Sequence, residues 1–303
     1  MGNITVIGSS NTDLIMQVDK IPGPGETLLS NQFSIAAGGK GANQAIAAAR
    51  AGGNVTFIAC IGTDNFGDNA VEGFKKENIN TSFIKRTNDV PSGIALIFVD
   101  TNGENSIGVA PGSNFELTPK NIDDSFDGIS DTDVFLSQLE IPIETVEHAV
   151  SIARQQGNIY ILDPAPAELL SDDLLKNISI ITPNESEVEK LTGIIVTDET
   201  SAKSACDKLH ARGTDTIILT MGSKGAFLLN STHSCLLPAY KVDAVDTTGA
   251  GDVFNGTLAK ALSDGVGIKE AIEFANAGAA LSVTKLGAQT SAPKESEIRA
   301  FLV

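Results

Sequence analysis

The chain has 303 residues, 42% of them hydrophobic and 19% charged, which is typical of a soluble globular protein with one large α/β domain or two small ones. It has 21 Lys+Arg and 38 Asp+Glu, so the net charge is 21 − 38 = −17, which argues against nucleic acid or an anionic membrane as a partner. Three cysteines without a CxxC pair and three scattered histidines argue against a zinc site or a histidine-based triad. The sequence starts without a signal-peptide pattern and has no apolar run near the roughly 20 residues of a membrane span, so we expect a cytoplasmic protein.

Strand-like and helix-like segments alternate along most of the chain. The predicted strands are 4–7, 55–61, 134–138, 159–162, 178–182 and 216–220. The predicted helices are 41–50, 66–77, 143–156, 185–191, 202–211, 250–262 and 268–284. This alternation predicts the α/β class, with a mainly parallel sheet flanked by helices on both faces in a single domain over 1–303. In such a sheet, ligands bind beyond the carboxyl ends of the strands.

Two segments, 13–36 and 93–109, interrupt this alternation. Both combine period-2 patterns of apolar residues with turns, and neither has the spacing of a helix. We therefore expect them to form a small separate β-sheet. A small sheet needs a second surface to bury its apolar face, so this one is predicted to be a lid over a site or a dimer contact.

A glycine-rich motif, DTTGAGD at 246–252, directly precedes a predicted helix. Glycines leave backbone N–H groups uncovered where a helix begins, and that end carries a partial positive charge, so it favours an anion such as phosphate. Asp252 adds a carboxylate at the same place, which suits a base facing a hydroxyl that attacks phosphorus. The alternative is that Asp252 only caps the helix.

A second glycine-rich motif, GGKGAN, lies at 38–43. It is not a Walker A loop, which requires GxxxxGK[ST], and the glycine spacing at 249–251 does not match the Rossmann fingerprint, so a nicotinamide dehydrogenase is disfavoured. Together the two motifs resemble those of the sugar kinase family that contains ribokinase, fructokinase and adenosine kinase, and the resemblance covers essentially the whole chain. Lys40 and Asn43, with NTD at 11–13, resemble the ribokinase members in particular.

The resemblance implies ATP-dependent phosphorylation of the 5-hydroxyl of D-ribose, with Asp252 as the base and the backbone N–H groups of Gly249, Ala250 and Gly251 as an anion hole. It further implies sugar contacts from Asn11, Asp13, Gly39, Lys40, Asn43, Glu140 and Asp252. Carboxylates and amides suit a sugar because they offer acceptors and donors to vicinal diols. From the residues alone, the alternatives are a turn at 11–13, a ligand-free glycine turn at 38–41 and a surface acid at 140.

The same resemblance implies an ATP site. Its expected contacts are Asn184, Thr220, Gly222, Ser223, Gly225, Gly251 and Asn276, with Glu187 holding Mg²⁺ through water. At 276 the ribokinase members often carry His near adenine, so Asn276 departs from their pattern. The open alternatives are a capping box at 184–187 and a hairpin turn at 220–225.

The resemblance also implies a K⁺ site whose loops contain Asp246, Thr248, Ser282, Lys285, Gly287 and Ser291. The alternative is that Asp246 merely caps a turn. A homodimer formed through the lid is expected on the resemblance alone. Two other functions remain open: a kinase for another sugar or nucleoside, and a non-catalytic pentose or nucleotide sensor, which would have no need of the carboxylate at 252.

Overall fold

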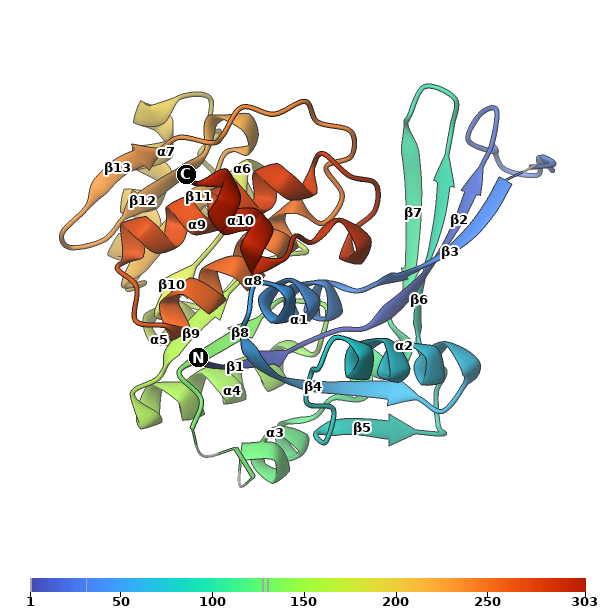
Figure 1. Ribbon diagram of the computed structural model, residues 1–303, viewed down its shortest axis with the longest axis horizontal. Coiled ribbons are helices and arrows are strands. Elements are labelled where there is room, and N and C mark those ends of the chain that lie inside the picture. The colour runs from blue at the N-terminus through green and yellow to red at the C-terminus, as the bar shows by residue number, and fades with distance from the viewer. Residues whose placement is uncertain (1, 31, 127, 130) are drawn as a thin grey trace.

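The computed structural model describes residues 2–30, 32–126, 128–129 and 131–303 (Figure 1). The remaining four positions lie outside the described residues. Three of them, Met1, Asp127 and Ser130, fall within the domain predicted over 1–303, and Asn31 also falls within the predicted lid segment 13–36. Among the helices so described, none is both long and apolar enough to cross a membrane.

The larger sheet has the strand order β13-β12-β11-β10-β9-β8-β1-β4-β5. Its strands are β1 (Asn3–Ile7), β4 (Asn54–Gly62), β5 (Ile84–Thr87), β8 (Val134–Ser137), β9 (Ile159–Leu162), β10 (Ile180–Ile181), β11 (Thr216–Thr220), β12 (Ala226–Leu229) and β13 (Ser234–Leu237). Neighbouring strands pair in parallel from β5 through to β11, and β12 and β13 add an antiparallel hairpin at one edge. The predicted α/β class with a mainly parallel sheet is confirmed.

Helices cover both faces of this sheet (Figure 1). They are α1 (Lys40–Arg50), α2 (Asn65–Lys76), α3 (Pro119–Phe126), α4 (Ile143–Gln156), α5 (Asp172–Asn177), α6 (Glu185–Thr192), α7 (Glu199–Ala211), α8 (Ala250–Ser263), α9 (Ile268–Ser282) and α10 (Glu295–Phe301). Short 3₁₀ turns lie at η1 (Gly112–Glu116), η2 (Gly222–Lys224) and η3 (Gln289–Ser291).

Two hydrophobic clusters fill the space between the sheet and its helices. Along β4, Phe57 and Ile61 belong to the cluster beneath α1, α8 and α9, whereas Ile58 and Cys60 belong to the cluster beneath α4 and α7. This follows from the strand geometry, since successive side chains point to opposite faces of a sheet. Both faces of the central strands are therefore buried, as expected for parallel strands covered on both sides.

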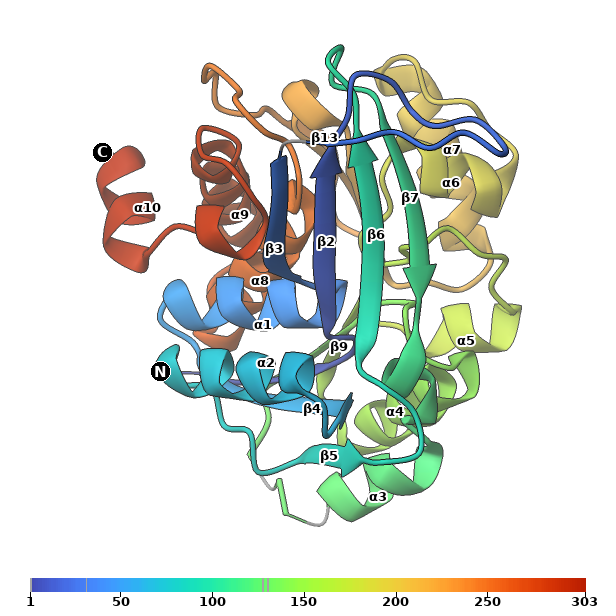
Figure 2. The same ribbon diagram turned by 90° about the vertical axis from the view of Figure 1, so that its right-hand side faces the viewer.

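The smaller sheet has the order β3-β2-β6-β7 and consists of β2 (Asn11–Gln17), β3 (Gln32–Gly38), β6 (Gly93–Val99) and β7 (Asn105–Ala110). These strands stand beside the larger body and meet it near α1 and α2 (Figures 1 and 2). The predicted small sheet is confirmed. Its base lies where β2 begins and β3 ends, because Asn11 pairs with Gly38 across the ladder.

Most predicted elements appear at or near their expected bounds, but β10 is shorter than predicted. The strand expected at 178–182 is reduced to Ile180–Ile181, because Ile178 ends α5 and the parallel ladders with β9 and β11 extend over two residues. Several short elements were not predicted, namely β5, β12, β13, α3, α5 and α10.

Candidate active site

Asp252 lies in the first turn of α8 and is only 6% exposed. The helix starts after Gly249, which has the left-handed backbone conformation (φ 73°), and a Cβ there would lie 2.9 Å from the Cβ of Ala288. Of the three N–H groups predicted to form an anion hole, that of Ala250 donates to the carbonyl of Thr247 at 3.2 Å. In this conformation, then, the Ala250 N–H points back into the turn.

Two amides of α1 hold the Asp252 carboxylate from both sides. Asn43 Nδ2 donates to Oδ2 at 2.8 Å, and Gln44 Nε2 donates to Oδ1 at 3.1 Å. The two helices approach closely at Gly256, where a Cβ would come within 2.6 Å of the Gln44 carbonyl oxygen. Burial raises the pKa of Asp252 above its usual range, and Lys40 and the two amides oppose that rise.

Lys40 begins α1 and is surrounded by acids. Burial lowers its pKa, but this is outweighed by nearby carboxylates, which together raise the pKa above the usual value for lysine. The acids are Asp252, Asp163, Glu140 and Glu187. Glu140, Asp163 and Glu187 follow the parallel strands β8, β9 and β10, and Asp252 lies at the start of α8, so the fold concentrates charge where the topology predicts ligand binding.

Glu140 follows β8 and reaches the start of α1. Its Oε2 accepts from the backbone N–H of Lys40 at 3.0 Å and from Ser9 Oγ at 2.5 Å. A carboxylate at a helix N-terminus satisfies an otherwise orphaned N–H and complements the helix dipole. Glu140 is therefore not simply a surface acid, because both contacts tie it to neighbouring elements.

Asn11 and Asp13 lie within strand β2 and not in a turn. Asn114 Nδ2 donates to Asn11 Oδ1 at 2.7 Å, and the Asn114 Oδ1 accepts from the backbone N–H of Ser10 at 2.9 Å. Since a backbone N–H can only donate, these contacts fix the orientation of both amides and leave the Asn11 NH₂ as the donor for other partners. Burial, with a smaller effect of Glu140, raises the pKa of Asp13 to about 6.

Most of the candidate ATP residues come from two neighbouring segments, whereas Gly251 and Asn276 lie on α8 and α9. Asn184 and Glu187 form a capping box at the start of α6, with Asn184 Oδ1 accepting from the Glu187 N–H at 2.9 Å and Glu187 Oε2 accepting from the Asn184 N–H at 2.7 Å. An isolated bridge joins Asn184 to Thr220 at the end of β11. The capping-box alternative is thus realised. Glu187 is nevertheless buried, and burial raises its pKa.

The segment 221–225 connects the antiparallel strands β11 and β12, so the hairpin alternative is realised as well. Met221 N–H donates to the Gly225 carbonyl at 2.7 Å, and Gly222 and Ser223 are exposed at its tip. Asn276 lies elsewhere, buried on α9, where its Nδ2 donates to the carbonyls of Leu237 and Pro238. Its amide therefore supports the chain that leaves β13.

Three of the candidate K⁺ residues, Asp246, Thr248 and Gly287, meet at one turn. Asp246 Oδ1 accepts from the Thr248 N–H at 2.9 Å and Oδ2 from the Gly287 N–H at 2.8 Å. Burial raises the pKa of Asp246, but these hydrogen bonds outweigh burial and hold the pKa below its usual range. The hydroxyls of Ser282 and Ser291 donate to carbonyls of their own turns, and Lys285 pairs with Glu297. Asp246 thus caps a turn that brings the predicted loops together.

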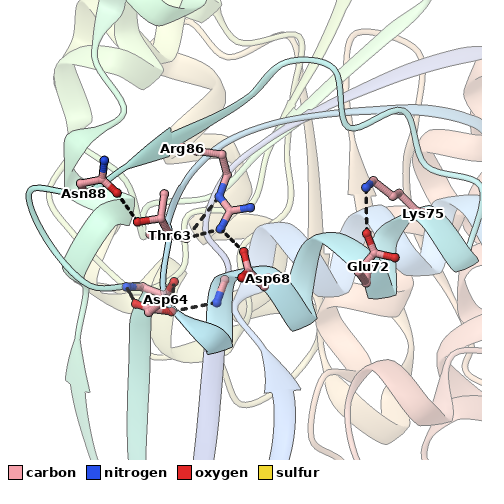
Figure 3. A network of polar contacts seen from close by, with 10 residues as sticks. Thr63, Asp64, Asp68, Glu72, Lys75, Arg86 and Asn88 are labelled. Carbon is pink, nitrogen blue, oxygen red and sulfur yellow. Dashed lines mark hydrogen bonds and ion pairs between the residues drawn. The ribbon is translucent and has the colours of Figure 1, made fainter.

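The joint between the small sheet and the body is held by a polar network beside the start of α2 (Figure 3). Asp64 caps α2 through the Gly67 N–H at 2.9 Å and accepts from both the N–H (2.7 Å) and the Oγ (2.9 Å) of Ser92, the residue before β6. Arg86 donates to the Gly62 carbonyl and to Asp68. Together with the Asn114 contacts after β7, these bonds anchor both ends of the β6–β7 hairpin.

Four residues of this site were not singled out from the sequence: Ser9, Gln44, Asn114 and Asp163. Asp163 follows β9, so the rule that ligands gather at the carboxyl ends of strands could have found it. Gln44 is the neighbour of a motif residue. Within the described part of the chain, no three His, Cys, Asp or Glu side chains are grouped as a metal site.

Comparison with known proteins matches residues 1–295 to the pfkB family carbohydrate kinases. Ribokinase from Haemophilus influenzae is 45% identical over 299 residues, covering 99% of this chain and 98% of that protein. Deoxyribokinase from Salmonella typhi is 37% identical over 301 residues, covering 99% of this chain and 98% of that protein. The structure of Arabidopsis thaliana ribokinase complexed with ribose and ATP superimposes with a TM-score of 0.92 at 29% identity, covering 99% of this chain and 98% of that one.

Proposed function

This chain belongs to the pfkB family of carbohydrate kinases and is a sugar kinase of the ribokinase kind, and we propose that it transfers the γ-phosphoryl group of ATP to the 5-hydroxyl of D-ribose. The observation that carries the proposal is the buried Asp252 carboxylate at the N-terminus of α8, with Lys40 and Asn43 beside it. A carboxylate at a helix N-terminus matches a hydroxyl acceptor next to a phosphoryl group.

In the proposed reaction, the 5-hydroxyl gives its proton to a carboxylate oxygen of Asp252, and the hydroxyl oxygen forms a bond to the γ-phosphorus. The bond from that phosphorus to the β–γ bridging oxygen breaks, and ADP leaves. The raised pKa of Asp252 favours its role as proton acceptor, because a stronger base accepts the proton more readily. The N–H groups of Gly249, Ala250 and Gly251 stabilise the transferred group, which requires the Ala250 contact with Thr247 to open.

We assign the sugar to the group of side chains around Lys40, in contact with Asn11, Asp13, Gly39, Lys40, Asn43 and Glu140. One atom supports this assignment directly: Asn43 Oδ1 is buried, and no described group donates to it. A buried acceptor without a partner is costly, so a sugar hydroxyl is a fitting donor. The φ of +89° at Gly39 lets the backbone approach the base of the small sheet closely.

We propose that the ATP phosphates lie between the α8 N-terminus and the two loops at 184–187 and 220–225, with Asn276 supporting the adenine side through the chain after β13. Mg²⁺ commonly uses one or two carboxylates together with substrate phosphates, which fits the buried Glu187, one of whose oxygens is engaged in the capping box. When bound, the ion neutralises charge that develops on the phosphates.

For K⁺, we propose the loops that carry Asp246, Thr248, Ser282, Lys285, Gly287 and Ser291, because the Asp246 carboxylate joins two of these loops through Thr248 and Gly287. A homodimer through the small sheet is part of the proposal. The apolar side chains of Phe33, Ile35 and Leu96 share one face of this sheet and are 49–59% exposed, whereas Ile107 and Val109 lie on the opposite face. Exposed apolar side chains grouped on one face are a mark of an interaction site.

The test is ADP release from ATP·Mg²⁺ with D-ribose, 2-deoxyribose, fructose or adenosine, each with and without K⁺. We expect a ribose-selective signal that K⁺ stimulates. Selectivity for 2-deoxyribose would instead indicate the activity for which the 37% identical deoxyribokinase is named. The absence of turnover with every acceptor, in protein shown to be folded, would favour the sensor.

A further inference from the structure

Gln44 is completely buried on α1 and joins the two carboxylates deepest in the site. Its Nε2 donates to Asp163 Oδ2 at 2.7 Å and to Asp252 Oδ1 at 3.1 Å. A side-chain amide nitrogen carries two hydrogens, so one Gln44 NH₂ group satisfies both carboxylates at once.

The orientation of this amide follows from its partners at both ends, the two carboxylates and Gln138. Gln138 Nε2 donates to Gln44 Oε1 at 2.6 Å, so Oε1 is the acceptor and Nε2 the donor. The reverse orientation would put an acceptor oxygen against two carboxylates and a nitrogen donor against another donor. The chain of contacts therefore runs in one direction, from Gln138 through Gln44 to the two aspartates.

We propose that Gln44 is a positioning residue for phosphoryl transfer: its amide NH₂ group, shared with Asp163, holds the Asp252 carboxylate in the orientation and the ionised state that the reaction needs. This rests on the proposed role of Asp252 as the base. Asn43 holds Oδ2 from the neighbouring position of the same helix, so the two amides together fix the plane of the carboxylate. A base held in this way does not have to reorient when the hydroxyl arrives.

The sign of the effect follows from the charges facing Asp252. They are Lys40 on α1, Glu140 after β8, Asp163 after β9 and Glu187 on α6. Burial and the acids favour the protonated form of Asp252, whereas Lys40 and the amide donors favour the ionised form. Removing the Gln44 donor therefore makes Asp252 harder to ionise, and the acidic limb of the kcat profile moves to higher pH.

The experiment compares wild type with Gln44→Met, which keeps the length of the side chain and removes its donors. We expect kcat to fall roughly tenfold at pH 8 and by a larger factor at pH 6, since a hydrogen bond to a charged group is worth about 10- to 100-fold. The affinity for ribose should change much less than kcat. The matched control is Tyr160→Phe, which removes another buried hydrogen bond, from the tyrosine hydroxyl to Ser137 at 2.7 Å.

A role confined to stability would lower the thermal midpoint in both variants and leave the shape of both pH profiles as in wild type; that result would overturn the proposal. If Gln44→Met does not fold, Gln44→Glu serves instead, because a third carboxyl group in place of the amide should move the acidic limb the same way. Failure of this inference is separable from failure of the function. ¹³C NMR titration of the aspartate carboxyls, assigned with Asp252→Asn, reports on the Gln44 contact even if ribose is not the substrate.

Discussion

At the scale of single residues, the site places four acidic side chains around one lysine. Asp252, Asp163, Glu140 and Glu187 surround Lys40, and burial raises the pKa of three of them. An ATP molecule approaching this cluster meets repulsion from the acids as well as from the net charge of −17 on the whole chain. We therefore expect binding of ATP to depend on an accompanying cation and on local N–H donors.

The first prediction concerns the proposed base. We expect Asp252→Asn to lower kcat by about 10²–10⁴-fold, the usual loss when a positioned base is removed. Ribose and ATP affinities should stay near their wild-type values, because the amide has nearly the shape of the carboxylate. Steady-state kinetics and calorimetric titration measure the two effects separately. Turnover close to wild type would remove Asp252 from this role.

A second prediction follows from Asp13. With a pKa of about 6, its carboxyl group is mostly ionised at pH 7 and mostly protonated at pH 5. If the sugar hydroxyl requires the ionised acceptor, ribose should bind about tenfold more weakly at pH 5 than at pH 7, which follows from the proton linkage of a single group. Calorimetric titration over this range measures the change, and Asp13→Asn should flatten the profile. A Kd for ribose that is constant across the range would contradict the role of Asp13.

At the scale of elements, the start of α1 is assembled from distant parts of the chain. Glu140 and Ser9 meet the first turn of the helix, and Gly39 lets strand β3 run directly into it. A Cβ at Gly39 would lie 2.6 Å from the backbone nitrogen of Asn11 and 2.8 Å from the Cα of Ser10. The backbone, not a movable side chain, blocks any substitution there.

We therefore expect Gly39→Ala to destabilise the fold by at least about 1–2 kcal/mol, since a side chain at positive φ is itself strained by that amount. It should also weaken ribose binding, because α1 carries Lys40 and Asn43, while ATP affinity should change less. Thermal unfolding and separate titrations with the two ligands measure these effects. Gly73→Ala is the control, because a Cβ there meets no described atom within 4 Å. Equal thermal midpoints and equal ribose affinities in the two variants would contradict the steric argument.

The sequence predicted the repeating elements well and the contacts between them poorly. Helix α4 and strands β9 and β11 have their predicted bounds because each is an apolar or periodic segment with turn residues at its ends. The hairpin strands β12 and β13 were missed because, in the described segment 216–237, no α-helix separates them from β11, so they fall outside the alternation of strands and helices that predicted the other strands. Gln44 was missed for a different reason: its role depends on the packing of α1 against α8, and those helices are some 200 residues apart in sequence.

At the scale of the whole molecule, the exposed apolar side chains of the small sheet point to a second copy of the chain as its partner. We expect the protein to sediment at twice its 31.5 kDa monomer mass, with the small sheets of two copies in contact. Phe33 and Ile35 point to the same face of β3, so Ile35→Glu places a charge within an apolar patch and should favour the monomer. Analytical ultracentrifugation measures this, with exposed Leu169→Glu, outside the small sheet, as the control. A wild-type protein that stays monomeric at high concentration would contradict the dimer.

The base of the small sheet lies beside the candidate sugar contacts. Asn11 and Gly38 pair at the base of β2 and β3, and the sugar residues Asp13, Gly39 and Lys40 lie directly beside that pair. Each strand runs seven residues outward from it, roughly 20 Å at the usual rise per residue. A small rotation of the sheet about the Asn11–Gly38 pair would therefore displace the far turn around 22–25 much more than the residues beside the pair. If ribose binding rotates the small sheet about this pair, a fluorescent dye on that turn should report the rotation at a distance from the reacting groups.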